Sequence, residues 1–193
     1  MKVLLTGFEP FGNLTTNASW EAVKRVSERL GESIEVDKLL LPVEYGRAAE
    51  RCLARIAEIT PDAVLSVGVA TSRKAMTPEY LAINVRNSRS SDNAGKVCLG
   101  EPVIDEGESV LYTNFPYAEM LASLASVGAA VEASFDAGTY VCNELFYRVM
   151  YHIRFAEKKP LGGFLHIPPE SVIDSGTVAK AIEAFLLMLD ARG

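Results

Sequence analysis

The sequence lacks a surplus of basic residues, because 19 Lys and Arg stand against 25 Asp and Glu and give a net charge of −6. Proteins that bind nucleic acid by neutralising phosphates normally carry an excess of Lys and Arg. Long apolar runs are also missing, and the longest, around residues 63–70, stops far short of the roughly 20 residues needed to cross a bilayer. We therefore expect neither a nucleic-acid partner nor a membrane-spanning segment.

Two further features are scarce: a secretory signal and paired cysteines. The apolar start of the chain reaches Gly7 and Glu9 too early for a secretory apolar region of about 7–15 residues, so we expect a cytoplasmic protein. The three cysteines, Cys52, Cys98 and Cys142, are odd in number, far apart and without a C-x-x-C pair. This spacing disfavours a disulfide framework and a cysteine-rich zinc site. At least one thiol must have another role.

Phosphate-binding glycine motifs, internal repeats and linker-like composition shifts are absent as well. The sequence therefore predicts one domain over residues 1–193. Apolar patterning predicts strands at 2–6, 34–43, 63–69, 130–135 and 161–167. Helices are predicted from the Asn17 cap to a stop at Gly31, and at 45–59, 116–127, 141–155 and 178–191. A hairpin or edge strand at 80–85 and a long loop or irregular hairpin at 86–108 complete a predicted sheet with helices on both faces.

Cys142 is the thiol with the most suggestive position. It follows a glycine-containing turn and opens the predicted helix at 141–155. Unpaired N–H groups and the helix dipole at such a position favour the thiolate, which would make Cys142 a nucleophile. The alternative is a small buried apolar residue. Cys52 and Cys98 lack such a setting, and we expect them to be structural.

His166 stands at the carboxyl end of the predicted strand 161–167, and Cys142 is expected at the same edge of the sheet. An imidazole next to a thiol could serve as its base, although a strand-end histidine could simply bind backbone. Glu79 follows the third strand and could orient that imidazole, or cap a turn. His152 lies within a helix and is expected to be structural.

A loop with two aromatic residues between glycines, Phe8 and Phe11, follows the first strand directly. Such a loop could clamp a small ligand because glycine permits close backbone approach. The alternative is that both rings fold into the core.

Seven segments together resemble the pyroglutamyl peptidase I family, and the match runs from about residue 3 to 190 in order. These segments are Thr6–Gly12, Asn17–Glu21, Thr77–Glu79, Ala82–Asn84, Asp92–Asn93, Ala137–Asn143 and Gly162–Pro168. The resemblance implies an α/β/α sandwich with a central, twisted and mostly parallel sheet. It also implies a cysteine exopeptidase that removes an N-terminal pyroglutamyl residue from peptides.

The resemblance also assigns roles. Cys142, His166 and Glu79 match the family's nucleophile, base and orienting acid, and Arg89 matches its arginine near the developing oxyanion. Substrate-binding positions carried over in the same way are Phe8, Phe11, Asn17, Val69, Tyr140 and Val141. The implied partner is a small peptide with a blocked N-terminus. No metal or cofactor is required, and a homo-oligomer, dimer or tetramer, is expected.

Several positions depart from the family's pattern. Thr71 and Ser72 replace two glycines, Arg86 and Asn87 replace an acidic pair, Ser90 replaces an apolar residue, Ala18 replaces a proline, and Glu144 replaces a histidine. We expect the Glu144 carboxylate to oppose ionisation of Cys142 and raise its pKa. Two alternatives therefore stay open: a Cys-His hydrolase of another small acyl or amide substrate, and a catalytically idle relative that binds peptide ends or serves in an assembly.

Overall fold

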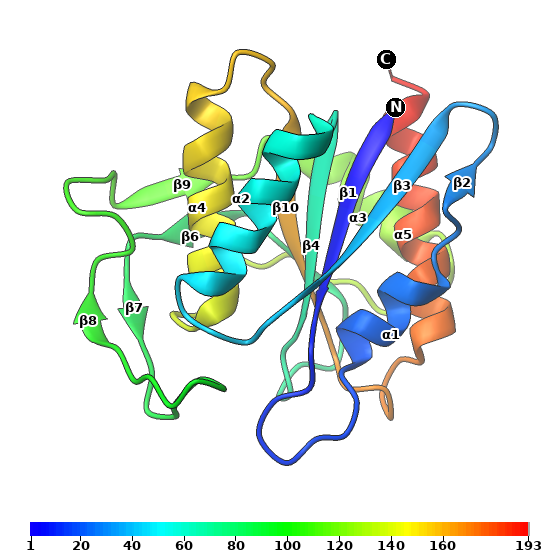
Figure 1. Cartoon of the computed structure of the whole chain (residues 1–193). Coiled ribbons are helices and arrows are strands. Elements are labelled where there is room, and N and C mark those ends of the chain that lie inside the picture. Colours follow the sequence, from blue (N-terminus) through cyan, green and yellow to red (C-terminus); the bar gives the residue numbers. More distant parts are fainter. Residues whose placement is uncertain (193) are drawn as a thin grey trace.

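A six-stranded sheet forms the centre of the structure, a computed structural model that describes residues 1–192 (Figure 1). Its strands, in spatial order, are β2 (Arg29–Leu30), β3 (Ile34–Leu41), β1 (Lys2–Phe8), β4 (Ala63–Val69), β10 (Leu161–Ile167) and β5 (Thr77–Glu79). The four central strands run parallel, and β2 and β5 pair antiparallel at the edges. The mostly parallel sheet is confirmed.

Helices cover both faces of this sheet (Figure 1). The helices on one face are α1 (Ala18–Arg25), α3 (Tyr117–Ala125) and α5 (Ser175–Asp190), and those on the other are α2 (Arg47–Ile59) and α4 (Val141–Phe155). The predicted three-layer arrangement is therefore confirmed. Over residues 1–192, no helix is both long and apolar enough to cross a membrane.

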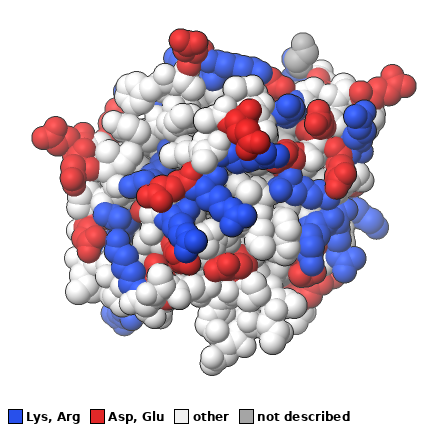
Figure 2. Space-filling model, viewed as in Figure 1, with Lys and Arg blue, Asp and Glu red and all other residues white. Residues whose placement is uncertain are grey.

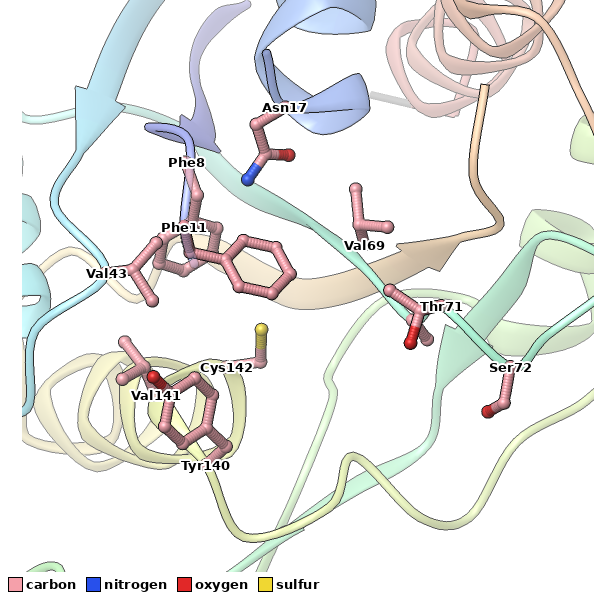
Figure 3. A pocket seen from close by; sticks show the side chains of 11 residues that line it. Phe8, Phe11, Asn17, Val43, Val69, Thr71, Ser72, Tyr140, Val141 and Cys142 are labelled. Atoms are coloured by element: carbon pink, nitrogen blue, oxygen red, sulfur yellow. The ribbon is translucent and has the colours of Figure 1, made fainter. Parts of the chain in front are cut away.

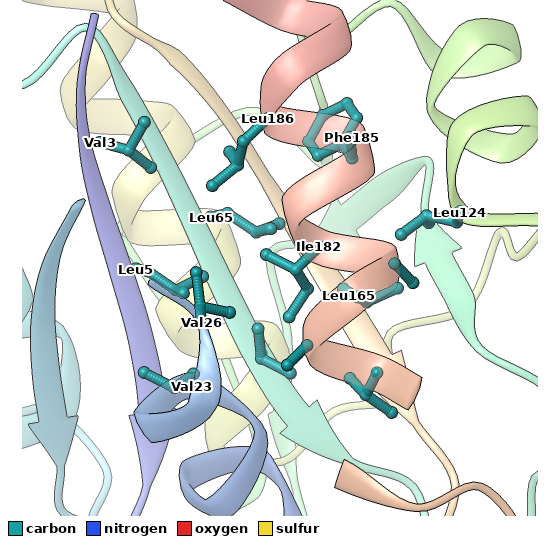
Figure 4. Close-up of a cluster of buried hydrophobic side chains, with 14 of the residues drawn as sticks. Val3, Leu5, Val23, Val26, Leu65, Leu124, Leu165, Ile182, Phe185 and Leu186 are labelled. Carbon is teal, nitrogen blue, oxygen red and sulfur yellow. The ribbon is translucent and has the colours of Figure 1, made fainter. Parts of the chain in front are cut away.

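The core is divided by the sheet because successive side chains of a strand point to opposite faces. On one side, Leu5 and Leu65 pack with Ile182 and Phe185 of α5, as Figure 4 shows. On the other side, Leu4, Val64 and Phe164 pack beneath α2 and α4. Burial on both faces explains why these strands are apolar almost throughout.

Two small antiparallel sheets occupy the segment that we predicted as a hairpin and a long irregular loop. One joins β6 (Leu81–Ile83) to β9 (Val110–Tyr112), and the other joins β7 (Arg86–Asn87) to β8 (Leu99–Glu101). The β7–β8 pair projects from the α4 side of the molecule (Figure 1).

The helix predicted from Asn17 to Gly31 is too long. Asn17 caps α1 by accepting a hydrogen bond from the Ser19 N–H, but the helix ends at Arg25. Leu30 pairs instead with Ile34 in a hairpin between β2 and β3. Gly31 does adopt a positive φ of 60°, but in the turn of this hairpin rather than at a helix end.

The strand predicted at 130–135 is wrong. Only two isolated parallel bridges form there, Met76 with Val131 and Glu79 with Ser134. The Met76 N–H binds the Ala130 carbonyl and the Tyr80 N–H binds that of Ser134. The donor between them would be residue 78, which is a proline without an N–H. The ladder is therefore interrupted, and the segment follows β5 without forming a strand.

On the face shown in Figure 2, basic and acidic side chains are interspersed. That face carries no broad basic surface of the kind that attracts phosphates.

Candidate active site

Cys142 lies in the first turn of α4, where the chain enters the helix from a tight turn. Gly138 in that turn has a φ of 75°, and its N–H donates to Asp136 Oδ1 at 2.8 Å. The Cys142 side chain is half-buried and reaches the backbone of β4. A Cβ on Gly68 would stand only 2.9 Å from its Sγ. Glycine at position 68 therefore makes room for the sulfur.

His166 lies on the neighbouring strand, directly opposite Gly68 in the register of β4 and β10. The structure thus brings Cys142 and His166 to the same end of the sheet. The imidazole Nδ1 contacts Oε1 of Glu79 at 2.7 Å. Both side chains are buried, with His166 5% and Glu79 1% exposed. A carboxylate at this distance fixes the orientation of the ring and favours a proton on Nδ1.

The Glu79 carboxylate has two further partners that the sequence did not single out. Arg73 donates from Nη1 to Oε1 at 2.5 Å, and the Ser134 hydroxyl donates to Oε2 at 2.5 Å. Ser134 lay within the mispredicted strand. Arg73 follows the altered pair Thr71 and Ser72, and no motif indicated that it would reach back to Glu79.

The expected low pKa of Cys142 is not found. Burial is the main cause that raises the pKa of this thiol to about 12, and the Glu79 carboxylate adds to the rise. Arg73 and the Cys142 N–H act in the opposite direction. The helix N-terminus is present as predicted, but loss of solvation outweighs it. The resting side chain is therefore a thiol at neutral pH.

Glu144 also differs from expectation. Its carboxylate is fully buried on the far side of α4, where Oε2 accepts the Gly46 N–H at 2.7 Å. Arg86 and Arg148 approach Oε1 at 3.4 and 3.8 Å. Residues two apart on a helix point in different directions, and Glu144 is not among the causes that raise the Cys142 pKa. The acid that acts on the sulfur is Glu79.

A cavity of about 290 Å³ opens beside the Cys142 sulfur. All six substrate-binding positions named from the sequence line it, together with Val43, Ala70, Thr71 and Ser72. In Figure 3, the rings of Phe8 and Phe11 lie toward one end of the cavity, and Thr71 and Ser72 lie toward the other. Its size and apolar walls suit a small uncharged group.

Asn17 fixes the loop that follows β1, which ends at Phe8 and leads to Phe11. Its Nδ2 donates to the Glu9 carbonyl at 2.8 Å, while its Oδ1 caps α1. Phe8 is buried and Phe11 half-buried. Both interpretations of this loop therefore hold in part, since the rings pack against the core and line the cavity.

Arg89 is exposed. It is not among the residues that line the cavity in the described part of the chain, residues 1–192. Its loop is nevertheless tied to the turn before Cys142. The Asn87 N–H binds the Thr139 carbonyl at 2.9 Å, and the Tyr140 hydroxyl donates to the Ser91 carbonyl at 3.1 Å. Arg89 thus belongs to a loop that is tied to the site, but its side chain does not line the cavity.

Comparisons with known proteins identify the family of this chain. The family model described as pyroglutamyl peptidase matches residues 1–185. The chain belongs to the pyroglutamyl peptidase family. Pyrrolidone-carboxylate peptidase of Erwinia tasmaniensis is 38% identical over 192 residues, which cover 98% of this chain and 89% of that protein. The corresponding protein of Clostridium perfringens is 38% identical over 176 residues, covering 90% and 82%.

Solved structures of the family share the fold. Pyroglutamyl peptidase I of Bacillus amyloliquefaciens superposes with a TM-score of 0.93 at 33% identity, covering 98% of this chain and 97% of that one. Pyrrolidone carboxyl peptidase of Pyrococcus furiosus gives a TM-score of 0.92 at 28% identity, covering 100% and 99%. The chain is therefore a family member over almost its whole length.

Proposed function

We propose that this chain is a cysteine exopeptidase that hydrolyses the bond after an N-terminal pyroglutamyl residue. Cys142 is the nucleophile, His166 the base and acid, and Glu79 the group that orients His166. One observation carries this assignment: the Cys142 sulfur packs on Gly68, whose strand partner is the histidine held by Glu79. Family membership supplies the substrate class.

Acylation begins from the neutral thiol. His166 removes the thiol proton as Sγ bonds to the pyroglutamyl carbonyl carbon, and the carbonyl electron pair moves to oxygen. Free N–H groups in the first turn of α4 stabilise the resulting oxyanion. When the tetrahedral adduct collapses, the C–N bond breaks and His166 returns its proton to the departing amine. The acyl group remains on Cys142 as a thioester.

Deacylation uses the same groups with water as the nucleophile. His166 takes a proton from water as the oxygen attacks the thioester carbonyl carbon. The C–S bond then breaks, the sulfur recovers the proton, and pyroglutamate leaves. Glu79 stabilises the imidazolium in both halves of the reaction because its carboxylate lies 2.7 Å from Nδ1.

Recognition of the lactam follows from the walls of the cavity. A pyroglutamyl ring has an apolar body and an uncharged amide edge, which suit a small space between Phe8, Phe11 and Val69. A free N-terminal glutamine would have to place an ammonium group there. Burying an unpaired charge is costly, so such peptides would be excluded.

Arg89 is proposed to act at the rim of the site. Its loop is hydrogen-bonded to Thr139 and Tyr140, the residues that lead into Cys142. A movement of the exposed side chain would bring its charge toward the oxyanion.

We further propose that the protein works in the cytoplasm as a dimer or tetramer. Leu99 on β8 is 77% exposed and Phe155 at the end of α4 is 68% exposed. A contact between subunits that covered these side chains would remove apolar surface from water. Light scattering during gel filtration measures the mass in solution, and a monomer at all concentrations would contradict the proposal.

The catalytic proposal is tested by release of a fluorescent amine from a pyroglutamyl amide. Wild type should turn over, Cys142→Ala should not, and Cys52→Ala should retain activity because Cys52 lies within the α2 side of the core. Turnover that survives in Cys142→Ala would overturn the proposal.

Two other outcomes would favour the remaining alternatives. No turnover with rapid alkylation of Cys142 would indicate a different acyl or amide substrate. No turnover with an unreactive Cys142 would indicate an idle relative that binds peptide ends.

A further inference from the structure

Arg73 joins parts of the site that are distant in the sequence. Its Nη1 donates to Glu79 Oε1 at 2.5 Å and also contacts the Thr77 hydroxyl. Its Nη2 donates to the Asp136 carbonyl at 2.6 Å, in the turn that leads into Cys142. The guanidinium is mostly buried, with 22% of the side chain exposed.

Arg73 and His166 share one oxygen atom. Both bind Oε1 of Glu79, while the Ser134 hydroxyl binds Oε2. A carboxylate held at both oxygens cannot rotate without breaking these hydrogen bonds. Arg73 and Ser134 therefore influence the orientation of the His166 ring through Glu79, which contacts the ring directly.

The charge of Glu79 creates a conflict within the site. It stabilises an imidazolium at His166, yet it opposes a negative charge on the Cys142 sulfur. The positive charge of Arg73 acts on the sulfur in the opposite direction. An arginine beside Glu79 can therefore preserve the stabilisation of the imidazolium while reducing the opposition to a negative charge on the sulfur.

We propose that Arg73 is a positioning residue of this active site, which fixes the Glu79 carboxylate for His166 and offsets its negative charge at the Cys142 sulfur. The proposal rests on the catalytic function proposed above. Arg73 acts through Glu79 and through its charge, without touching the substrate.

Other charged or titratable groups near the sulfur come from each neighbouring element. Glu79 lies on β5, His166 on β10 and Arg73 in the turn after β4. Tyr140 precedes α4, and a negative charge on Cys142 contributes to raising the pKa of its hydroxyl. Glu144, on α4 itself, points away toward Arg86. Within the described residues, Arg73 is the cation that acts on the thiol.

The first test measures alkylation of Cys142 by iodoacetamide across pH, followed by mass spectrometry of the peptide that contains this residue. Arg73→Met should shift the pH profile of alkylation to higher pH by about one unit. At a fixed pH below the pKa of Cys142, alkylation then becomes about tenfold slower. Arg73→Lys keeps the charge and should remain much closer to wild type. No substrate is needed, so this readout is independent of the peptidase assignment.

The second test separates positioning from charge by steady-state kinetics with a pyroglutamyl amide. Arg73→Met should lower kcat about tenfold or more with little change in KM. Arg73→Lys should lower kcat by a smaller factor, because an ammonium group lacks the planar fork that reaches Glu79 and Asp136 together. Arg55→Met is the matched control, since Arg55 on α2 binds Asp37 of β3 and Glu58 of α2, away from the site.

A double variant keeps the proposal testable if Arg73→Met folds poorly. With Glu79→Gln already present, replacing Arg73 by Lys should change kcat much less than it does in the wild-type background. Wild-type alkylation and kinetics in folded Arg73→Met would overturn the proposal. Equal losses from Arg73→Lys in the wild-type and Glu79→Gln backgrounds would also overturn it.

Discussion

The sulfur of Cys142 lies 2.9 Å from the position that a Cβ on Gly68 would occupy. The proposed nucleophile thus packs on the backbone of β4, at the position of that strand that pairs with His166. Even a methyl group at this position would occupy the space of the sulfur.

Gly68→Ala should therefore impair catalysis more than folding. The new methyl group would stand 2.8 Å from the Phe164 ring as well as against the sulfur, and overpacking of this kind costs about 1–3 kcal/mol. We expect kcat/KM for a pyroglutamyl amide to fall at least tenfold, while circular dichroism shows a folded protein.

Gly162→Ala is the matched control for this change. Its methyl group would meet Ile153 and Met150 at the opposite end of β10. It should lower the free energy of unfolding but leave kcat nearly unchanged. Similar kcat losses in both variants would show that overpacking in general, and not displacement of the Cys142 sulfur, explains the effect.

Cys52 should make stability depend on pH in the alkaline range. Burial raises its pKa from 9.0 to about 12, so the folded state holds the proton more tightly than the unfolded state. The stabilisation is complete below pH 9 and is lost as pH rises toward 12. Between pH 8 and 11, wild type should lose up to about 3 kcal/mol that Cys52→Ala does not lose.

Urea unfolding at both pH values measures this difference. Tyr45 and Cys142 also have pKa values raised to about 12, mainly by burial, and both remain in the variant. The comparison therefore isolates Cys52. Equal pH dependence in the two proteins would refute the assignment.

Glu144 is expected to stabilise the fold without acting on the Cys142 thiol. Glu144→Gln removes the buried carboxylate that faces Arg86 and Arg148. Arg86 keeps Glu101 at 3.5 Å, and both arginines can still reach water because 18% and 28% of their side chains are exposed. We expect a loss of about 1–3 kcal/mol in urea unfolding and an unchanged pH profile of Cys142 alkylation. Glu79→Gln should instead shift the pH profile of Cys142 alkylation to lower pH, because it removes the charge that raises the pKa of this thiol. A similar shift in Glu144→Gln would contradict the account.

Thr71 and Ser72 should limit the size of the leaving group. The Arg73 N–H binds the Ala70 carbonyl at 3.1 Å, which places these two residues at the tip of a turn. Both are exposed and line the cavity away from the phenylalanine end. The double variant T71G/S72G should therefore raise kcat/KM for bulky aromatic leaving groups by a larger factor than for pyroglutamyl-alanine. Equal changes for both substrates would place the leaving group elsewhere.

Much of the fold could be predicted because burial dictates sequence pattern. The limits of β4, β10 and α4 agree with the predicted 63–69, 161–167 and 141–155. These elements are largely buried, and burial gives them long apolar patterns that are readily recognised. The errors arose where a pairing partner mattered. Leu30 continued a helical pattern but paired with β3, and Pro78 interrupted a ladder that the 130–135 pattern suggested.

The site was only partly predictable. The resemblance placed Cys142, His166 and Glu79 together, but local sequence could not show that burial would raise the Cys142 pKa. Nor could it show that Glu144 would point to Gly46 or that Arg73 would reach Glu79. These features depend on side-chain direction and on solvent access, which are set by tertiary packing.

The most direct test of the account is to identify the atom that carries the acyl group during turnover. Wild-type enzyme mixed with a pyroglutamyl amide, acid-quenched within the first turnovers and digested, should yield a pyroglutamyl thioester on the peptide containing Cys142. The adduct should be absent from Cys142→Ala. Amine release by wild type with no adduct on Cys142, or with the acyl group on another residue, would contradict the account.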